Sequence, residues 1–177
     1  SVGHVHRHPG LLHYAHGAPR EGKLVYVKAR IRLDGGAYAS SSTAVIANAA
    51  CFAVGPYECP NATIDGWVVY TNNPPCGAMR GFGSVQNCYA HEAQMDKLSA
   101  ALGMDPIELR IRNAMKTGRS MITGQVVEGP GPVADLLRRV RDVPLPRANA
   151  RNPIDLTDMP GGVSHTTPGE AVKRGWA

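Results

Sequence analysis

The sequence has few charged side chains, since Asp, Glu, Lys and Arg make up 19% of its 177 residues. Globular domains average about 25%, so a free-standing domain with a fully solvated surface is disfavoured. We expect a piece that buries some faces against a larger protein. The net charge is +5, but only Arg138, Arg139 and Arg141 cluster, and no aromatic residues alternate with basic ones. This pattern argues against nucleic acid as a partner.

The sequence also lacks a Cys-x-x-Cys pair and any long apolar run. Its four cysteines are irregularly spaced, which disfavours a metal or iron–sulfur site built from them alone. With no signal peptide in view, reduced thiols in a cytoplasmic protein are expected. No apolar run approaches the ~20 residues of a transmembrane helix, so a membrane partner is not expected either.

Alternating hydrophobicity predicts two strands. Residues 23–33 place Val25, Val27, Ala29, Ile31 and Leu33 on one side, and a turn at residues 34–36 should end this strand. Residues 62–70 form the second expected strand. The small, apolar residues 37–54 between them suit either a close-packed helix or a loop in a tight interface.

Three helices are expected after the second strand, which indicates an α+β fold. The first spans residues 84–102, with Ser84 as N-cap and Gly103 at its end. Its apolar residues recur at helical spacing: Val85, Cys88, Tyr89, Met95, Leu98 and Leu102. A second helix should follow an Asp105 cap and run to about Met115, and a third should span residues 132–141. Beyond them we expect an irregular connector, with a strand beginning near residue 173.

The loop at residues 72–83 joins the second strand to the first helix. Gly77, Gly81 and Gly83 would let the backbone approach a ligand closely. The start of the following helix suits an anion, because its N–H groups are unpaired. The glycines do not follow the dinucleotide-binding order, and a plain glycine-rich turn stays open as the alternative.

Histidines are concentrated near the amino end of the sequence. His4, His6 and His8 alternate, so on a strand they would share one face. Three imidazoles on one face can bind zinc or another divalent metal. An exposed or interface strand without metal is the competing interpretation, and we expect no metal site.

Across most of its length, the chain resembles the molybdenum subunits of the xanthine dehydrogenase family, and the similarity is weakest over residues 127–163. The matching segments occur in the family's order: residues 7–9, 34–38, 55–57, 60–61, 71–72, 78–83, Gln86, Glu92, 95–96, 110–113, 123–125 and 169–175. The resemblance implies a fragment of the molybdopterin-binding domain. Residues 1–126 would belong to the cofactor-binding part, and residues 127–177 would form a helix plus an irregular connector.

The resemblance also implies roles for the loop. Gly77, Ala78, Met79, Arg80 and Gly81 would bind the molybdenum–pterin cofactor. Phe82 would contact a flat heteroaromatic substrate, as aromatic rings can, although a core aromatic is the alternative. The implied partners are the rest of the molybdenum subunit, together with FAD and [2Fe-2S] on other subunits or domains.

Two positions bear on the substrate. Gly81 stands where carbon monoxide dehydrogenases of this family carry a copper-binding Cys, which disfavours that activity. Asn48 stands where animal xanthine enzymes carry a substrate-binding Arg; it could hydrogen-bond a purine or be structural. The loop is most similar to bacterial purine-catabolic subunits. We therefore expect hydroxylation of xanthine or hypoxanthine with water as oxygen source, and an aldehyde or another N-heterocycle as alternative substrates.

No residue of this chain is expected to be the catalytic base. In the family, that Glu lies downstream of the segment matched by Ala177, and another pterin-contact segment lies upstream of Ser1. Glu92 follows the loop, but a structural role fits it better. We therefore expect the isolated chain to be inactive. A purely structural or interaction fragment is the hypothesis from another functional class.

Overall fold

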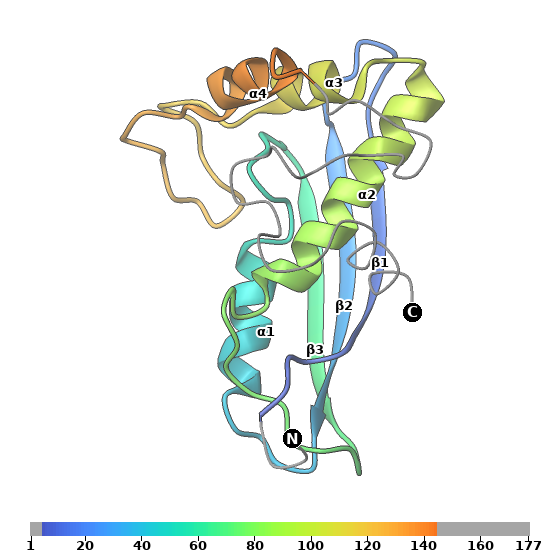
Figure 1. The fold of residues 1–177 in the computed structure, drawn as a ribbon, viewed down its shortest axis with the longest axis vertical. Helices are drawn as coiled ribbons and strands as arrows, with labels where there is room; N and C mark the ends of the chain where they lie inside the picture. Colours follow the sequence, from blue (N-terminus) through green and yellow to red (C-terminus); the bar gives the residue numbers. More distant parts are fainter. Residues whose placement is uncertain (1–4, 145–177) are drawn as a thin grey trace, which may run out of the picture. The chain divides into compact units, whose positions relative to one another are not determined.

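The computed structural model describes residues 5–144. The chain divides into two compact units, residues 1–139 and 140–177. The first unit contains a three-stranded sheet of β1 (Gly10–Gly17), β2 (Tyr26–Gly36) and β3 (Ala62–Tyr70), in that spatial order (Figure 1). β1 runs antiparallel and β3 parallel to β2.

Four helices complete the described part of the chain and confirm the predicted α+β class. They are α1 (Ser42–Cys51), α2 (Ser84–Leu102), α3 (Pro106–Asn113) and α4 (Val133–Arg141). Within residues 37–54, the helix is therefore the alternative that forms. The predicted connector and final strand lie outside the described residues. None of the helices between residues 5 and 144 is both long and apolar enough to cross a membrane.

β2 is the centre of the sheet, and its sequence explains why. Val27, Ala29, Ile31 and Leu33 are all at most 1% exposed, while the residues between them face solvent. The predicted turn after Leu33 is wrong, because the strand continues to Gly36. Asp34 accepts a hydrogen bond from the Gly36 amide at 2.8 Å, and the pairing with β3 shifts register there. An irregularity of this kind absorbs an extra residue without ending the strand.

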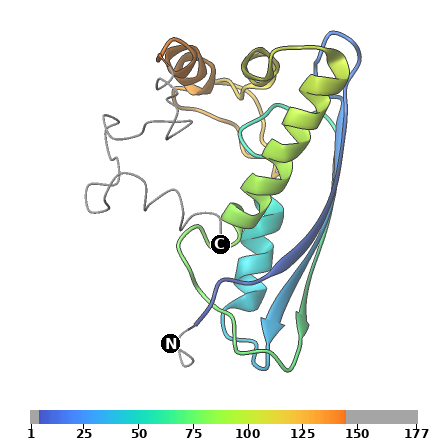
Figure 2. The same cartoon turned by 45° about the vertical axis from the view of Figure 1, so that its right-hand side comes forward.

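Helices α1 and α2 cover the same face of the sheet (Figure 2). Val45 of α1 packs with Ala29, Ile31 and Leu33. Met95 of α2 packs with Val27, together with Leu109 of α3. The face that β2 presents away from the helices carries Lys28, Arg30 and Arg32, and all three are exposed. The hydrophobic core therefore lies between the sheet and the helices.

The buried face of α2 differs from the predicted apolar stripe. Val85, Cys88 and Tyr89 are exposed, Tyr89 by 80%. The second half of the stripe is confirmed, because Met95 is buried and Leu98 and Leu102 pack on the core. The other buried side chains of α2 are small or polar: Asn87, Ala90, His91 and Ser99. Small residues allow α2 to lie close to the sheet and to α1, and this close packing takes precedence over hydrophobicity.

β1 has no counterpart among the predicted strands. It is an edge strand in which only alternate residues are partly buried, with Leu12 and Tyr14 packing on the core and His16 beside them. Histidines interrupt its apolar alternation, so periodicity alone does not reveal it. α3 begins as predicted, because the Asp105 carboxylate accepts the Glu108 amide at 2.8 Å.

Candidate functional site

The loop between β3 and α2 is tied to the protein at its base and exposed at its tip. The Cys76 amide donates to the Gly35 carbonyl at 3.0 Å, and the Gly77 amide donates to the His6 carbonyl at 3.1 Å. Cys76 and Gly77 are buried, whereas residues 78–80 are exposed. A rigid base therefore presents the main chain of Ala78, Met79 and Arg80 outward.

The glycines of this loop serve its packing against the protein. A Cβ on Gly81 would overlap the Val85 side chain, and one on Gly83 would overlap the Val45 carbonyl. Both residues also have a positive φ, +91° and +98°, a conformation that side-chain-bearing residues rarely adopt. The glycines thus set the shape of the turn, and the surface left for a ligand is the main chain of residues 78–80.

The amino end of α2 has no side-chain cap. Gly83 is the N-cap residue, and Ser84 is already helical and donates its hydroxyl to the Gly81 carbonyl. The predicted Ser84 cap is therefore wrong, because the helix begins one residue earlier than expected, directly after the turn at residues 81–83. The first turn also contains no acidic residue. Its N–H groups and the exposed Arg80 nearby suit an anionic ligand.

The two residues predicted to contact substrate lie together. Asn48 Nδ2 donates to the Phe82 carbonyl oxygen at 2.8 Å. Phe82 is only partly exposed and packs beside the core cluster of Ala29, Ile31 and Leu33. Its φ of +47° is unusual for a bulky residue. The Asn48 amide therefore holds the end of the loop in a strained conformation.

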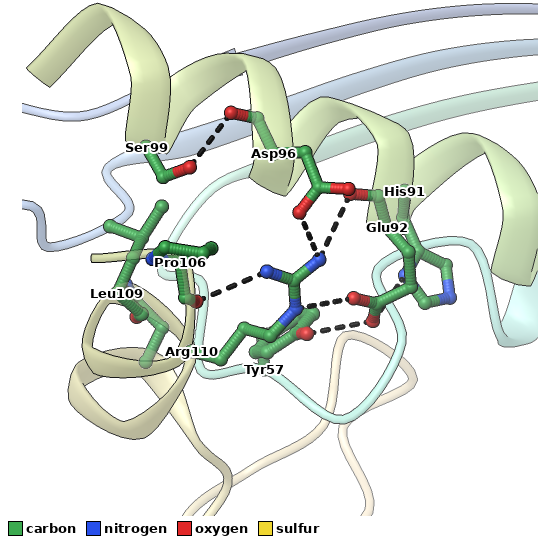
Figure 3. A network of polar contacts seen from close by, with 9 residues as sticks. Tyr57, His91, Glu92, Asp96, Ser99, Pro106, Leu109 and Arg110 are labelled. Carbon is green, nitrogen blue, oxygen red and sulfur yellow. Dashed lines mark hydrogen bonds and ion pairs between the residues drawn. The ribbon is translucent and has the colours of Figure 1, made fainter. Parts of the chain in front are cut away.

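In the middle of α2, a network of polar side chains joins this helix to α3 and to the segment after α1 (Figure 3). Glu92 accepts from the Tyr57 hydroxyl at 2.7 Å and from Arg110 Nε at 2.7 Å. Arg110 also donates to Asp96 at 2.7 Å. The structural role expected for Glu92 is confirmed by these contacts.

The network keeps Glu92 charged. Burial alone would raise the pKa of this carboxyl, but the nearby His91 and the hydrogen bonds from Tyr57 and Arg110 outweigh burial and lower the pKa to about 2. Burial and the neighbouring Glu92 raise the pKa of Tyr57 above its ordinary range, so its hydroxyl stays a donor. A carboxylate held this way is a poor proton acceptor for a reaction.

Two histidines lie beside the network, the buried His91 and the partly buried His16. His91 is 4% exposed, and its Nδ1 is 3.2 Å from a Glu92 carboxylate oxygen but not in hydrogen-bonding geometry. Neither ring nitrogen of His16 has a hydrogen-bond partner in the described structure. Burial and, secondly, the nearby His91 lower the pKa of His16 to about 4, while Glu92 opposes this shift.

The alternative of three histidines on one strand face can be compared with the structure at two of its positions, His6 and His8. His8 is 2% exposed and its Nε2 lies 2.7 Å from Ser42 Oγ at the start of α1, whereas His6 is exposed. His4 lies outside the described residues. In the part of the chain that the structure describes, no three His, Cys, Asp or Glu side chains group as metal ligands. The four cysteines are all free.

Two buried asparagines also join separate segments of the fold. The periodicity of the sequence does not identify them as buried residues. Asn87 is fully buried and donates to the Ala49 carbonyl, joining α2 to α1. Asn113 accepts the Leu24 amide at 2.8 Å and donates to the Gly22 carbonyl at 2.7 Å. A polar residue within a helix is ordinarily assigned to the solvent face. Asn113 stands out in the sequence only because it lies in residues 110–113, one of the segments that carry the resemblance.

Residues 2–114 match the family model of the molybdopterin cofactor-binding domain. The chain is 46% identical over 136 residues to the nicotinate dehydrogenase large molybdopterin subunit of Eubacterium barkeri, covering 77% of this chain and 32% of that protein. It is 34% identical over 148 residues to a probable xanthine dehydrogenase subunit of Bacillus subtilis strain 168, covering 84% and 20% respectively. The chain therefore spans about a third or less of these relatives.

A solved structure shares the fold. The aldehyde oxidoreductase of Desulfovibrio gigas superposes with a TM-score of 0.72 at 32% identity, over 76% of this chain and 15% of that one. The fold and the family match thus define a molybdopterin-binding domain. The chain belongs to the molybdopterin cofactor-binding domain family of the molybdenum hydroxylases.

Proposed function

We propose that this chain is part of a molybdenum subunit that hydroxylates a nitrogen-containing aromatic ring, with water as the oxygen source. The observation that carries the proposal is the 46% identity to a nicotinate dehydrogenase subunit over 77% of the chain. The lower identity of 34% to a probable xanthine dehydrogenase subunit keeps purines as the second candidate. Nicotinate and purines share a flat, electron-poor ring, so one substrate class includes both.

In this proposal the loop holds the cofactor. Of the predicted set, the exposed main chain of Ala78, Met79 and Arg80 would face the anionic groups of the cofactor, while Gly77 and Gly81 would shape the turn that presents them. The exposed tip, the cationic Arg80 and the uncapped start of α2 all suit such a group. When bound, the molybdenum–pterin cofactor would supply the two-electron redox chemistry of the hydroxylation. Residues 1–126 would form this cofactor-binding part, and residues 127–177 would lead away from it.

Phe82 and Asn48 are the proposed substrate-side residues. Because Asn48 Nδ2 already donates one hydrogen bond to the Phe82 carbonyl, we infer that Asn48 positions Phe82 and contacts substrate through its oxygen or its second amide N–H. The proposed electron path leaves this subunit through [2Fe-2S] and FAD on partner subunits or domains. A cytoplasmic location, expected from the cysteines, stays part of the proposal.

No carboxylate in the network is free to act as the base. Glu92 is bound by Tyr57 and Arg110, and Asp96 is bound by Arg110. The 177-residue chain alone should therefore not turn over. Xanthine or nicotinate oxidation by the purified chain, followed with a dye acceptor, would overturn this inference.

The substrate is tested with the complete molybdenum subunit and its partners. Nicotinate, xanthine, hypoxanthine and an aliphatic aldehyde are compared as substrates by kcat/KM with one dye acceptor. The proposal predicts that a nitrogen heterocycle is preferred over the aldehyde by at least about 100-fold, the discrimination that a site built for polar ring atoms can reach. A preference for the aldehyde would contradict the proposed substrate class.

A further inference from the structure

β1 has a free edge, and the alternation of its main-chain groups can be established from three contacts. Asp34 of β2 donates its amide to the Pro9 carbonyl at 2.9 Å. Along an antiparallel strand, the N–H and C=O of one residue point to the same side and alternate with those of the next. Odd-numbered residues of β1 therefore pair with β2, and even-numbered residues point away from the sheet.

Two glutamines of α2 confirm this alternation. Gln86 Nε2 donates to the His8 carbonyl at 3.0 Å, and Gln94 Nε2 donates to the Tyr14 carbonyl. Both carbonyls belong to even-numbered residues. Between these two caps, the outward N–H and C=O groups of Gly10 and Leu12 have no hydrogen-bond partner within residues 5–144.

A groove of about 530 Å³ runs beside this uncapped stretch, between β1 and α2. Figures 1 and 2 show β1 at the edge of the sheet with α2 beside it. Tyr89, Ala90 and Ala93 form its helical wall, and Lys97 lies at its rim. Tyr89 is 80% exposed, which makes it the most exposed of the large hydrophobic side chains of α2.

We propose that an extended segment of the molybdenum-subunit polypeptide, from outside these 177 residues, adds to the edge of β1 as a further strand. The free groups of Gly10 and Leu12 are main-chain donors and acceptors in ladder geometry, and the partner that matches them is another polypeptide backbone. The segment places an apolar side chain against Tyr89 and an acidic side chain toward Lys97. The relatives contain that additional polypeptide, because this chain spans 32% and 20% of their lengths.

Strand addition is independent of the substrate proposed above, so its test measures amide hydrogen exchange instead of turnover. Exchange is measured residue by residue in the complete subunit and in the 177-residue chain. The Leu12 amide should exchange at least about 100-fold more slowly in the complete subunit, because only there is it paired. The Leu11 amide, which pairs with β2, should be protected in both and reports that the sheet is intact.

A matched pair of variants tests whether the slow exchange of the Leu12 amide depends on the groove. Ala93→Trp fills the helical wall and should restore fast exchange at Leu12 in the complete subunit. Ala100→Trp makes the same change at an exposed position of α2 outside the groove and should leave Leu12 protected. If the Leu11 amide also exchanges fast in Ala93→Trp, that variant has disturbed the sheet. Tyr89→Lys, at a position that is already exposed, is then used in its place and should restore fast exchange at Leu12.

Each remaining outcome overturns the proposal. Equal, fast exchange of Leu12 in both proteins would show that the edge stays free. Protection in the 177-residue chain that grows with concentration would assign the groove to a second copy. Protection in the chain at every concentration would assign it to the chain's own residues 145–177.

Discussion

At the scale of single residues, the Glu92 side chain of α2 joins its own helix to two other segments of the chain. Its partners come from the segment after α1 and from α3, and each bonds to it at 2.7 Å. The Arg110 side chain is only 14% exposed. Removing one member of a partly buried charge network costs more than the pair contributes, because the remaining charge loses its partner.

Glu92→Gln should therefore lower the free energy of unfolding by about 2–3 kcal/mol. Urea denaturation of the chain measures this change. Glu108→Gln is the control, because Glu108 pairs with Arg112 at 2.9 Å on a surface where both side chains are 41% exposed, and its loss should cost less than about 0.5 kcal/mol. Equal losses in the two variants would show that the network contributes no more than a surface ion pair.

The pH dependence of stability should report on His16. In the folded chain its pKa is about 4, against 6.5 for an ordinary histidine, so the unfolded chain binds the proton first as the pH falls. The stabilisation is fully present above pH 6.5 and is lost as the pH falls from 6.5 to about 4. Thermal unfolding across this window should show a smaller decrease for His16→Leu than for the unmodified chain.

His13→Leu, at an exposed position of the same strand, is the control and should keep the original pH profile. Below pH 4.5 a second loss should begin, because Glu92 has its folded pKa near 2 and its contribution falls as the pH drops toward that value. A His16→Leu profile that coincides with the unmodified one would assign the acid sensitivity to other groups.

At the scale of elements, alternation and caps predicted β2, β3, α2 and α3, because these elements have strong local signals. Local signals could not predict β1, whose histidines mask its alternation, or the first half of the face that α2 buries. There Asn87 bonds to Ala49 of α1 and Ala90 lies beside β1, so tertiary contacts and not hydrophobicity decide which residues are buried. The resemblance located the loop, but the reason for its glycines emerged only from their three-dimensional neighbours.

The contact between α1 and the start of α2 can be tested at Gly83. A Cβ there would overlap the Val45 carbonyl, whereas a Cβ on Gly103 meets nothing within 4 Å. Both glycines have a positive φ, so alanine should cost about 1–2 kcal/mol of backbone strain at either position. Gly83→Ala should add at least about 1 kcal/mol for the overlap. Urea midpoints of the two variants decide the matter, and equal midpoints would contradict the close contact.

At the scale of the whole molecule, the described part of this molybdopterin-binding domain leaves several surfaces uncovered. One face of the sheet is covered by helices, one edge of β1 is unpaired, and the loop at residues 78–80 projects outward. These open surfaces agree with the low charge content of the sequence. We also expect the chain alone to be inactive, because the two carboxylates of the network, Glu92 and Asp96, are engaged in structural contacts.

The central claim is that the exposed loop holds the molybdenum cofactor, and the molybdenum content of the purified complete subunit tests it most directly. Arg80→Glu reverses the charge at the loop tip, and Lys116→Glu makes the same reversal at another exposed position. Arg80→Glu should lower the molybdenum per subunit at least about tenfold at limiting cofactor, equivalent to about 1.4 kcal/mol of binding free energy, while Lys116→Glu should retain it. An unchanged molybdenum content in Arg80→Glu would contradict the assignment of the loop.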